Sequence, residues 1–351
     1  GISTGGNAGS LAVGVSVARN HITNTLEASV KDSTVHADEG GMNIQVLEDA
    51  TIMALSVAAS VSGSLSSGGG SALALSGGGA EALNDISSDA NAFVQDSTLT
   101  SRNDVQIIAI NDASIEADVY AIAASGSVGN GVAAAIGGAR AVNTVHGEGA
   151  NDKNQVKAYI QDSTVTVTSG SLEQTATSNQ SIDAVVGAGS IALSGATNGF
   201  AVGVSGAGAQ AINDVGMDVR AYIDNSGLPV SDPVQVPEIS VTGGDLTLRA
   251  IDASAITVVV GAGSIAASFA ADGPSVSIAI GVALAENTIQ NDVKAFIKQA
   301  DGVDVSGSIT LDAMESATIS STTVAVALGV GVSATTFGVA LSGAGANATN
   351  I

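Results

Sequence analysis

Apolar and polar or small residues alternate at every second position through most of the chain. Residues 324–331, for example, read Val-Ala-Val-Ala-Leu-Gly-Val-Gly. A period of two is typical of β-strands, whereas an amphipathic helix repeats its apolar positions every three to four residues. Uncharged windows at 50–80, 184–212 and 320–347 have the length of membrane helices, but glycine costs a helix about 1 kcal/mol per residue. We therefore predict strands throughout and no membrane insertion.

A long internal repeat organises these strands. The pattern Ala-x-Ala-x-Asn recurs six times, with serine in place of the first alanine in the first copy. Its asparagines, spaced by 64, 59, 70, 74 and 63 residues, are Asn20, Asn84, Asn143, Asn213, Asn287 and Asn350. Counting on from each asparagine in steps of two keeps returning small or apolar residues, which describes one long strand with a single inward face. In the third copy this count resumes only after an insertion, at Asn154.

The remainder of each unit repeats as well. A turn recurs at Asp32, Asp96 and Asp162, each followed by Ser-Thr, and loosens to Asp224-Asn225-Ser226 in the fourth copy. A short alternating segment comes next, then an acidic or amide position, then a strand rich in Gly, Ala and Val. We expect one single repeat domain, 1–351, with approximate repeats 20–83, 84–142, 143–212, 213–286 and 287–349, and with 1–19 as the tail of a preceding repeat.

These features predict an all-β fold, a β-solenoid in which about five repeats of 60–75 residues stack like the coils of a parallel β-helix. Each repeat could form one broad coil or three narrow ones. The segments within a unit do not resemble one another, which favours the broad coil. Stacking would place the six repeated asparagines in one column, where their amides can hydrogen-bond to each other as a ladder.

Composition restricts the core of such a solenoid and the partners it can take. The 351 residues weigh 33.8 kDa, include 44 glycines and no tryptophan, and are only 2% aromatic, so we expect a thin Ala/Gly/Val core. The net charge of −23 argues against nucleic acid and anionic membranes as partners, because both require basic surface. There are no cysteines, which excludes disulfides and thiolate metal sites.

Four units carry an aromatic residue between two inward positions, so that its side chain is expected to face outward. These residues form an aromatic stripe of Phe93, Tyr159, Tyr222 and Phe296. Basic residues accompany it at Lys157, Arg220 and Lys294. Two interpretations remain open. The stripe could be an interface for lateral association or a ligand, or its rings could simply stack from coil to coil and stabilise the sheet.

Acidic residues are expected to form two columns, one of Asp32, Asp96 and Asp162 and one of Asp49, Asp112, Asp252 and Glu315. Like charges about 5 Å apart repel by about 1 kcal/mol even in water, and calcium could relieve this through oxygen ligands. The sequence contains no glycine-rich calcium repeat and no EF-hand loop. Solvated turn residues are therefore favoured over a weak calcium site at Asp32, Asp96 and Asp162, and no other cofactor is expected.

The sequence gives little support for catalysis. The three histidines, His21, His36 and His146, occur in no repeated or paired setting, and no carboxylate pair stands apart from the repeated acids. We expect the protein not to be an enzyme, and a carbohydrate-active β-helix enzyme is only a minor alternative.

The Ala/Gly/Val-rich strands, the recurring Ala-x-Ala-x-Asn and the Asp-Ser-Thr turns together resemble the repeat regions of giant secreted bacterial β-solenoid surface proteins, of the filamentous-haemagglutinin-like adhesin or fibre type. The resemblance covers essentially the whole chain and rests on composition and style of repeat. It implies an extracellular or cell-surface location and a structural role as a fibre, sheath or matrix that self-associates end to end or laterally. The alternative is a stalk segment of a giant adhesin, for which surface glycans would be the partners.

Overall fold

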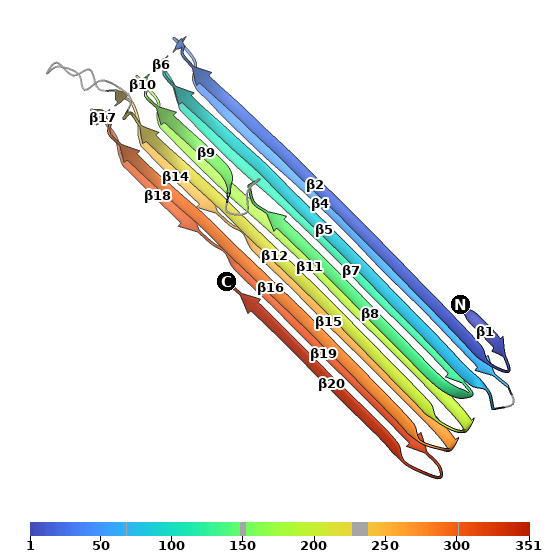
Figure 1. Ribbon diagram of the computed structural model, residues 1–351. Helices are drawn as coiled ribbons and strands as arrows, with labels where there is room; N and C mark the ends of the chain where they lie inside the picture. The colour runs from blue at the N-terminus through green and yellow to red at the C-terminus, as the bar shows by residue number, and fades with distance from the viewer. Residues whose placement is uncertain (68, 148–151, 227–237, 301) are drawn as a thin grey trace.

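The computed structural model describes the whole chain except residues 68, 148–151, 227–237 and 301. The described residues form strands and no helix, and the long strands of each sheet run parallel to one another along the length of the molecule (Figure 1). The predicted all-β solenoid is confirmed.

Three parallel sheets enclose the interior. The front sheet contains β2 (Ala8–Lys31), β5 (Ser71–Gln95), β8 (Asn130–Val145), β9 (Asn154–Gln161), β12 (Ala201–Asp224), β16 (Ser275–Lys298) and β20 (Gly338–Asn350). The back sheet contains β1 (Ile2–Gly5), β4 (Met42–Ser66), β7 (Val105–Val128), β11 (Leu172–Asn198), β14 (Leu246–Asp252), β15 (Ala255–Asp272), β18 (Ile309–Glu315) and β19 (Thr318–Ser333). The short sheet contains β3 (Thr34–Ala37), β6 (Thr98–Ser101), β10 (Thr164–Val167), β13 (Ile239–Val241) and β17 (Val303–Val305).

One repeat makes one broad coil. Asn20 pairs with Asn84 and Asn213 pairs with Asn287, so residues a full repeat apart are direct neighbours in the front sheet. Within a coil the chain crosses the front sheet, turns through the short sheet and returns along the back sheet. The insertion in the third repeat separates β8 from β9, which together occupy the place of one long strand. The prolines of the fourth repeat, Pro229, Pro233 and Pro237, lie outside the described residues.

The cross-section of the coil is wide at one end and thin at the other. In the wide half, where the short sheet separates the two long ones, the interior holds large side chains such as Leu99, Ile107 and Ile223, all fully buried. In the narrow half the front and back sheets face each other directly. There the inward positions are mostly alanine, serine and glycine, as at Ala74 and Ser76.

A column of glycines brings the two long sheets together in the narrow half. Gly14, Gly78 and Gly137 are direct neighbours in the front sheet, and the same column continues through Ala207 and Gly281. A Cβ atom at Gly78 would lie 2.7 Å from the carbonyl oxygen of Ile122 on the back sheet. The sheets therefore approach more closely than the roughly 10 Å usual for sheets that face each other. This contact is why the core is thin.

Candidate functional site

The six repeated asparagines form the predicted ladder inside the coil. Each side-chain amide nitrogen donates to the amide oxygen of the next asparagine, from Asn20 to Asn350, over 2.8 Å in the first four bonds and 2.9 Å in the last. The four inner members are almost completely buried. An unpaired buried amide costs about 1–3 kcal/mol, so stacking is what makes this polar column tolerable in the interior. All five bonds point the same way along the axis.

The aromatic stripe is a continuous stack on the outer surface of the front sheet, in the wide half. The ring centroids of Phe93, Tyr159, Tyr222 and Phe296 are successively 4.6, 4.8 and 5.0 Å apart, with nearly parallel planes. Lys31 covers the free side of Phe93, with its ammonium nitrogen 4.6 Å from the ring centroid. Phe93 is only 3% exposed, and burial raises the pKa of the Tyr159 hydroxyl to about 12. The rings thus stack from coil to coil, while a role for this stripe as an interface stays a prediction.

The basic residues beside the stripe are neutralised by acids on neighbouring positions. Arg220 donates to Asp218 over 2.6 Å, and Lys157 lies 3.8 Å from the same carboxylate. Lys294 lies 3.9 Å from Asp292. Burial lowers the pKa of Lys157, although the charge of Asp218 acts in the opposite direction. A polar cavity of about 540 Å³ opens next to these pairs, so the surface here has mixed charge rather than a basic stripe.

The turn aspartates occupy a backbone conformation that explains their identity. Asp32, Asp96 and Asp162 have φ of 47°, 49° and 48°, in the left-handed region that aspartate and asparagine tolerate better than most residues. In the fourth repeat the register places Asn225, not Asp224, over Asp162. Among the described residues no three His, Asp or Glu side chains gather as a metal site would require. The turn conformation by itself accounts for the recurrence of aspartate at this position.

The second expected acidic column does not form. Asp49 and Asp112 are neighbours, but the next member of their column is Asn179. Asp252 instead pairs with Ser178 and with Glu315. This column lies one residue away from the column of Asp49 and Asp112, and it faces the interior of the coil. The Asp252 carboxylate is fully buried and accepts hydrogen bonds from Asn291 at 2.7 Å and from the hydroxyl and amide of Ser254 at 3.0 and 3.2 Å. The bond from Asn291 ties the back sheet to the front sheet across the interior, while the two bonds from Ser254 are local.

One histidine has a paired setting that the sequence analysis missed. His21 lies between Thr23 and Asp85, with its Nε2 2.7 Å from the threonine hydroxyl and its Nδ1 2.9 Å from the carboxylate. The order hydroxyl, imidazole, carboxylate is that of a nucleophile with its base. The imidazole is more than half exposed on the first strand of the front sheet. Water competes there for every one of these hydrogen bonds, so we assign the arrangement to surface structure.

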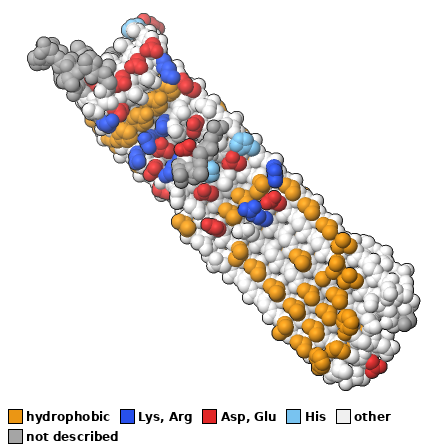
Figure 2. Space-filling model, in the orientation of Figure 1, with side chains coloured by type: hydrophobic (Ala, Val, Ile, Leu, Met, Phe, Trp, Pro, Cys, Tyr) orange, Lys and Arg blue, Asp and Glu red, His pale blue; other side chains and the backbone are white. Residues whose placement is uncertain are grey.

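The narrow half carries large apolar side chains on the outside. On the front sheet Val15 is 73% exposed and Ile136, in a central strand, is 65% exposed. On the back sheet Leu55 and Phe269 are 68% and 53% exposed. Figure 2 shows separated hydrophobic side chains over one half of the visible face, while the charged side chains gather over the other half. This apolar outer surface was not predicted from the sequence.

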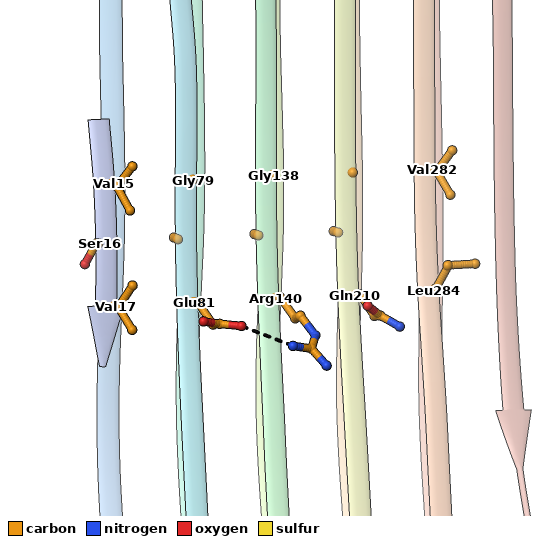
Figure 3. Close-up of a pocket in the computed structure, with 14 residues that line it drawn as sticks. Val15, Ser16, Val17, Gly79, Glu81, Gly138, Arg140, Gln210, Val282 and Leu284 are labelled. Atoms are coloured by element: carbon orange, nitrogen blue, oxygen red, sulfur yellow. Dashed lines mark hydrogen bonds and ion pairs between the residues drawn. The ribbon is translucent and has the colours of Figure 1, made fainter. Parts of the chain in front are cut away.

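A shallow groove crosses the strands within this apolar surface (Figure 3). Gly79, Gly138 and Gly208, neighbours on successive strands, form its floor, and Val15 and Val282 stand at its two ends. Its volume is about 450 Å³. The Glu81–Arg140 ion pair, 3.1 Å long, and the Gln210 amide lie along one side. A similar apolar groove on the back sheet has Gly63, Gly126 and Gly195 in its lining, together with Ile2 and Phe269.

No protein-family model matches the chain, and neither does any curated protein or solved structure. No helix in the described part of the chain is long and apolar enough to cross a membrane.

Proposed function

We propose that this chain is a segment of an extracellular fibre, sheath or matrix that grows by adding one β-coil to the next. The observation that carries the proposal is the polarity of the asparagine ladder. Each inner asparagine accepts from the preceding member and donates to the following one, so every repeat presents the same acceptor and the same donor along the axis. A ladder with one direction can be extended by any coil of the same design, including a coil of another copy.

The strand pairing between coils supports the same proposal. Long strands of the front sheet pair in parallel, residue for residue, with the equivalent strands one repeat away. Unpaired strand edges are templates for further pairing. Head-to-tail contacts of this kind do not close on themselves and so generate filaments.

Electron microscopy of the purified chain tests this proposal. We expect unbranched filaments, with a fibre-diffraction spacing of about 4.8 Å along the axis. Ala348→Lys places a charge on the inward side of the last strand, where the next coil would stack, and should abolish the filaments. Thr349→Lys, one residue away and outward, is the matched control and should leave them intact. Particles that remain single, at high concentration and in the unmodified chain, would refute the proposal.

Monomeric rods that bind glycans would instead favour the stalk of an adhesin. The polar cavity beside the aromatic stripe is the feature that would serve it, because Asp218, Arg220 and Asp292 present carboxylate and guanidinium groups to an opening of about 540 Å³. A glycan array with the unmodified chain, and with Arg220→Ala as control, distinguishes this role from the fibre.

A further inference from the structure

The front sheet of the narrow half has a nearly uncharged outer face, which we call the apolar front face. It consists of the outward-facing residues, every second one, of 8–17, 72–81, 131–140, 201–210, 275–284 and 338–347, which are aligned on six successive strands. Only Glu81 and Arg140 are charged in these ranges, and they pair with each other at the border of the face. Every other charge of this protein of net charge −23 lies elsewhere.

The size of the face matches what a stable protein contact requires. Six strands at about 4.8 Å and ten residues at about 3.3 Å give an area of roughly 950 Å². Specific interfaces bury about 800 Å² on each partner, whereas apolar patches left on soluble monomers are usually about 300–600 Å². The face is thus large enough for one complete interface.

The relief of the face is regular. One outward column reads, strand by strand, Val13, Gly77, Ile136, Gly206, Ile280 and Gly343. Large side chains and glycines therefore alternate from each strand to the next. Val13, Ile136 and Ile280 are 68%, 65% and 53% exposed, and a Cβ atom at each of the three glycines would meet nothing within 4 Å. The column is a row of knobs separated by open holes.

This relief is complementary to itself. Because knobs and holes alternate from strand to strand, an axis between two adjacent strands brings knobs over holes. A twofold axis along the strands, between β8 and β12, places β8 of one copy over β12 of a second copy, β5 over β16, and β2 over β20. Ile136 then faces Gly206, Ile280 faces Gly77 and Val13 faces Gly343, so every knob meets a hole.

We propose that a second copy of this chain docks on the apolar front face through this twofold arrangement. The contact is lateral, side by side between coils, and is independent of the end-to-end stacking proposed above. Both partners use the same patch, as an isologous interface requires. In the neighbouring column the same axis places Leu11 against Leu341, Leu75 against Ile278 and Ala134 against Val204, so apolar side chains meet there directly. The glycine holes of the first column receive its knobs at the separation that these apolar pairs set.

Exchanging a knob with its hole tests the arrangement. Ile136→Gly removes a knob, and Gly206→Ile fills the hole that faces it, so each change alone should weaken dimerisation at least tenfold. The double variant Ile136→Gly/Gly206→Ile puts the knob on β12 and the hole on β8, and should recover an affinity within about threefold of the original. Both residues point outward, so neither change disturbs the interior, and Ile136→Gly destabilises its strand only slightly. Circular dichroism checks that each variant keeps the fold.

The measurement is sedimentation velocity over a range of concentrations in the Ala348→Lys background, where end-to-end stacking is blocked. A dimer that weakens in both single variants and returns in the exchange supports the proposal. A monomer at all concentrations overturns it, as does a dimer that ignores all three variants. Association of the monomer with vesicles or glycans through this face, without a dimer, also overturns it. If the unmodified chain forms no filaments but still dimerises through this face, the end-to-end proposal fails and the lateral proposal stands.

Discussion

The closeness of the two long sheets can be tested with adjacent glycines on β5. Gly78 points inward and Gly79 points outward, because consecutive residues of a strand face opposite sides. A Cβ atom at Gly78 would lie 2.7 Å from the carbonyl oxygen of Ile122, 3.2 Å from its carbon and 3.4 Å from its nitrogen, whereas at Gly79 it would meet nothing within 4 Å. We predict that Gly78→Ala destabilises the chain and that Gly79→Ala does not.

The magnitude follows from the contact. The atoms that the new methyl group meets belong to the backbone of a central strand, so they can yield only if the two sheets separate locally. Overpacking of this kind costs about 1–3 kcal/mol. Both variants also reduce the entropy of the unfolded chain by the same Gly→Ala change, which is worth about 0.4–1 kcal/mol. The difference between the two variants therefore isolates the contact, and should be about 1–3 kcal/mol in favour of Gly79→Ala.

Urea unfolding followed by far-ultraviolet circular dichroism is the suitable assay, since the chain contains no tryptophan for fluorescence. It should be run at low concentration in the Ala348→Lys background, to keep association out of the transition. Amide hydrogen exchange then locates the effect. The amides of β5 and β7 should exchange faster in Gly78→Ala than in Gly79→Ala. Equal midpoints and equal exchange for the two variants would show that the sheets are not in contact at this column.

Three further predictions concern the ladder, the turns and the aromatic stack. Asn143→Leu leaves the amide nitrogen of Asn84 without its acceptor and the amide oxygen of Asn213 without its donor, and should cost about 2–5 kcal/mol in urea unfolding. The same change at the exposed Asn350 should cost less than about 1 kcal/mol, and similar losses at both sites would contradict a buried ladder. Asp96→Val should lower the free energy of unfolding by about 1–2 kcal/mol, because φ at this residue is 49°, whereas Asp96→Asn should leave it unchanged. Calorimetric titration of the unmodified chain with calcium should give no heat. Destabilisation by Asp96→Asn would show that the carboxylate, and not the turn conformation, selects aspartate. The pKa of Tyr159 is about 12 in the fold against about 10 in the unfolded chain. The neutral hydroxyl therefore contributes its full stabilisation below pH 10 and loses it as the pH rises from 10 to 12. After allowance for partial exposure, the free energy of unfolding should fall by about 1–2 kcal/mol over this range. Tyr159→Phe should abolish that loss at its site, and an unchanged alkaline transition would locate the sensitivity elsewhere.

The parity of the strands and the asparagine ladder could be predicted because both depend on residues that recur at fixed offsets. An asparagine flanked by alanines at two-residue spacing can face only one side of a strand, and a repeat of nearly constant length places its copies one above another. The single broad coil followed from the same periodicity. No contact between distant residues had to be known.

Asp252 was assigned to the wrong column because it was aligned with Asp49 and Asp112 by the Asp-Ala motif and not by the buried isoleucine that follows. Asp49 and Asp112 each precede an isoleucine by three residues, whereas Asp252 precedes Ile256 by four. In the structure it is the isoleucines that share a column. A shift of one residue moves a side chain to the other face of a sheet, which is why Asp252 is buried while Asp112 faces outward. Alignment on the buried isoleucine would have revealed this.

The apolar outer faces were missed because both parities of the narrow half are apolar, and only their size differs. On β2 the inward residues are Ala12, Gly14 and Ser16, and the outward ones are Leu11, Val13 and Val15. Ordinary expectation puts the larger hydrophobic residues in the core. The asparagine that fixes the inward parity lies on the same strand, so the sequence already contained the signal that the small set faces inward.

This inversion of size has a consequence for what the protein does. The contact between sheets at the glycine column leaves no room for Leu, Ile or Val inside the narrow half, so the coil gains nothing from the large residues that stand outside it. Serine or threonine at those positions would satisfy the same strands and keep the surface soluble. Exposed Ile136 and Ile280 therefore require an explanation outside the single coil, and the aligned glycines between them point to a surface of matching relief. Ladders inside the coil fix how successive coils stack along the axis, while the outer faces are left to determine what lies beside them.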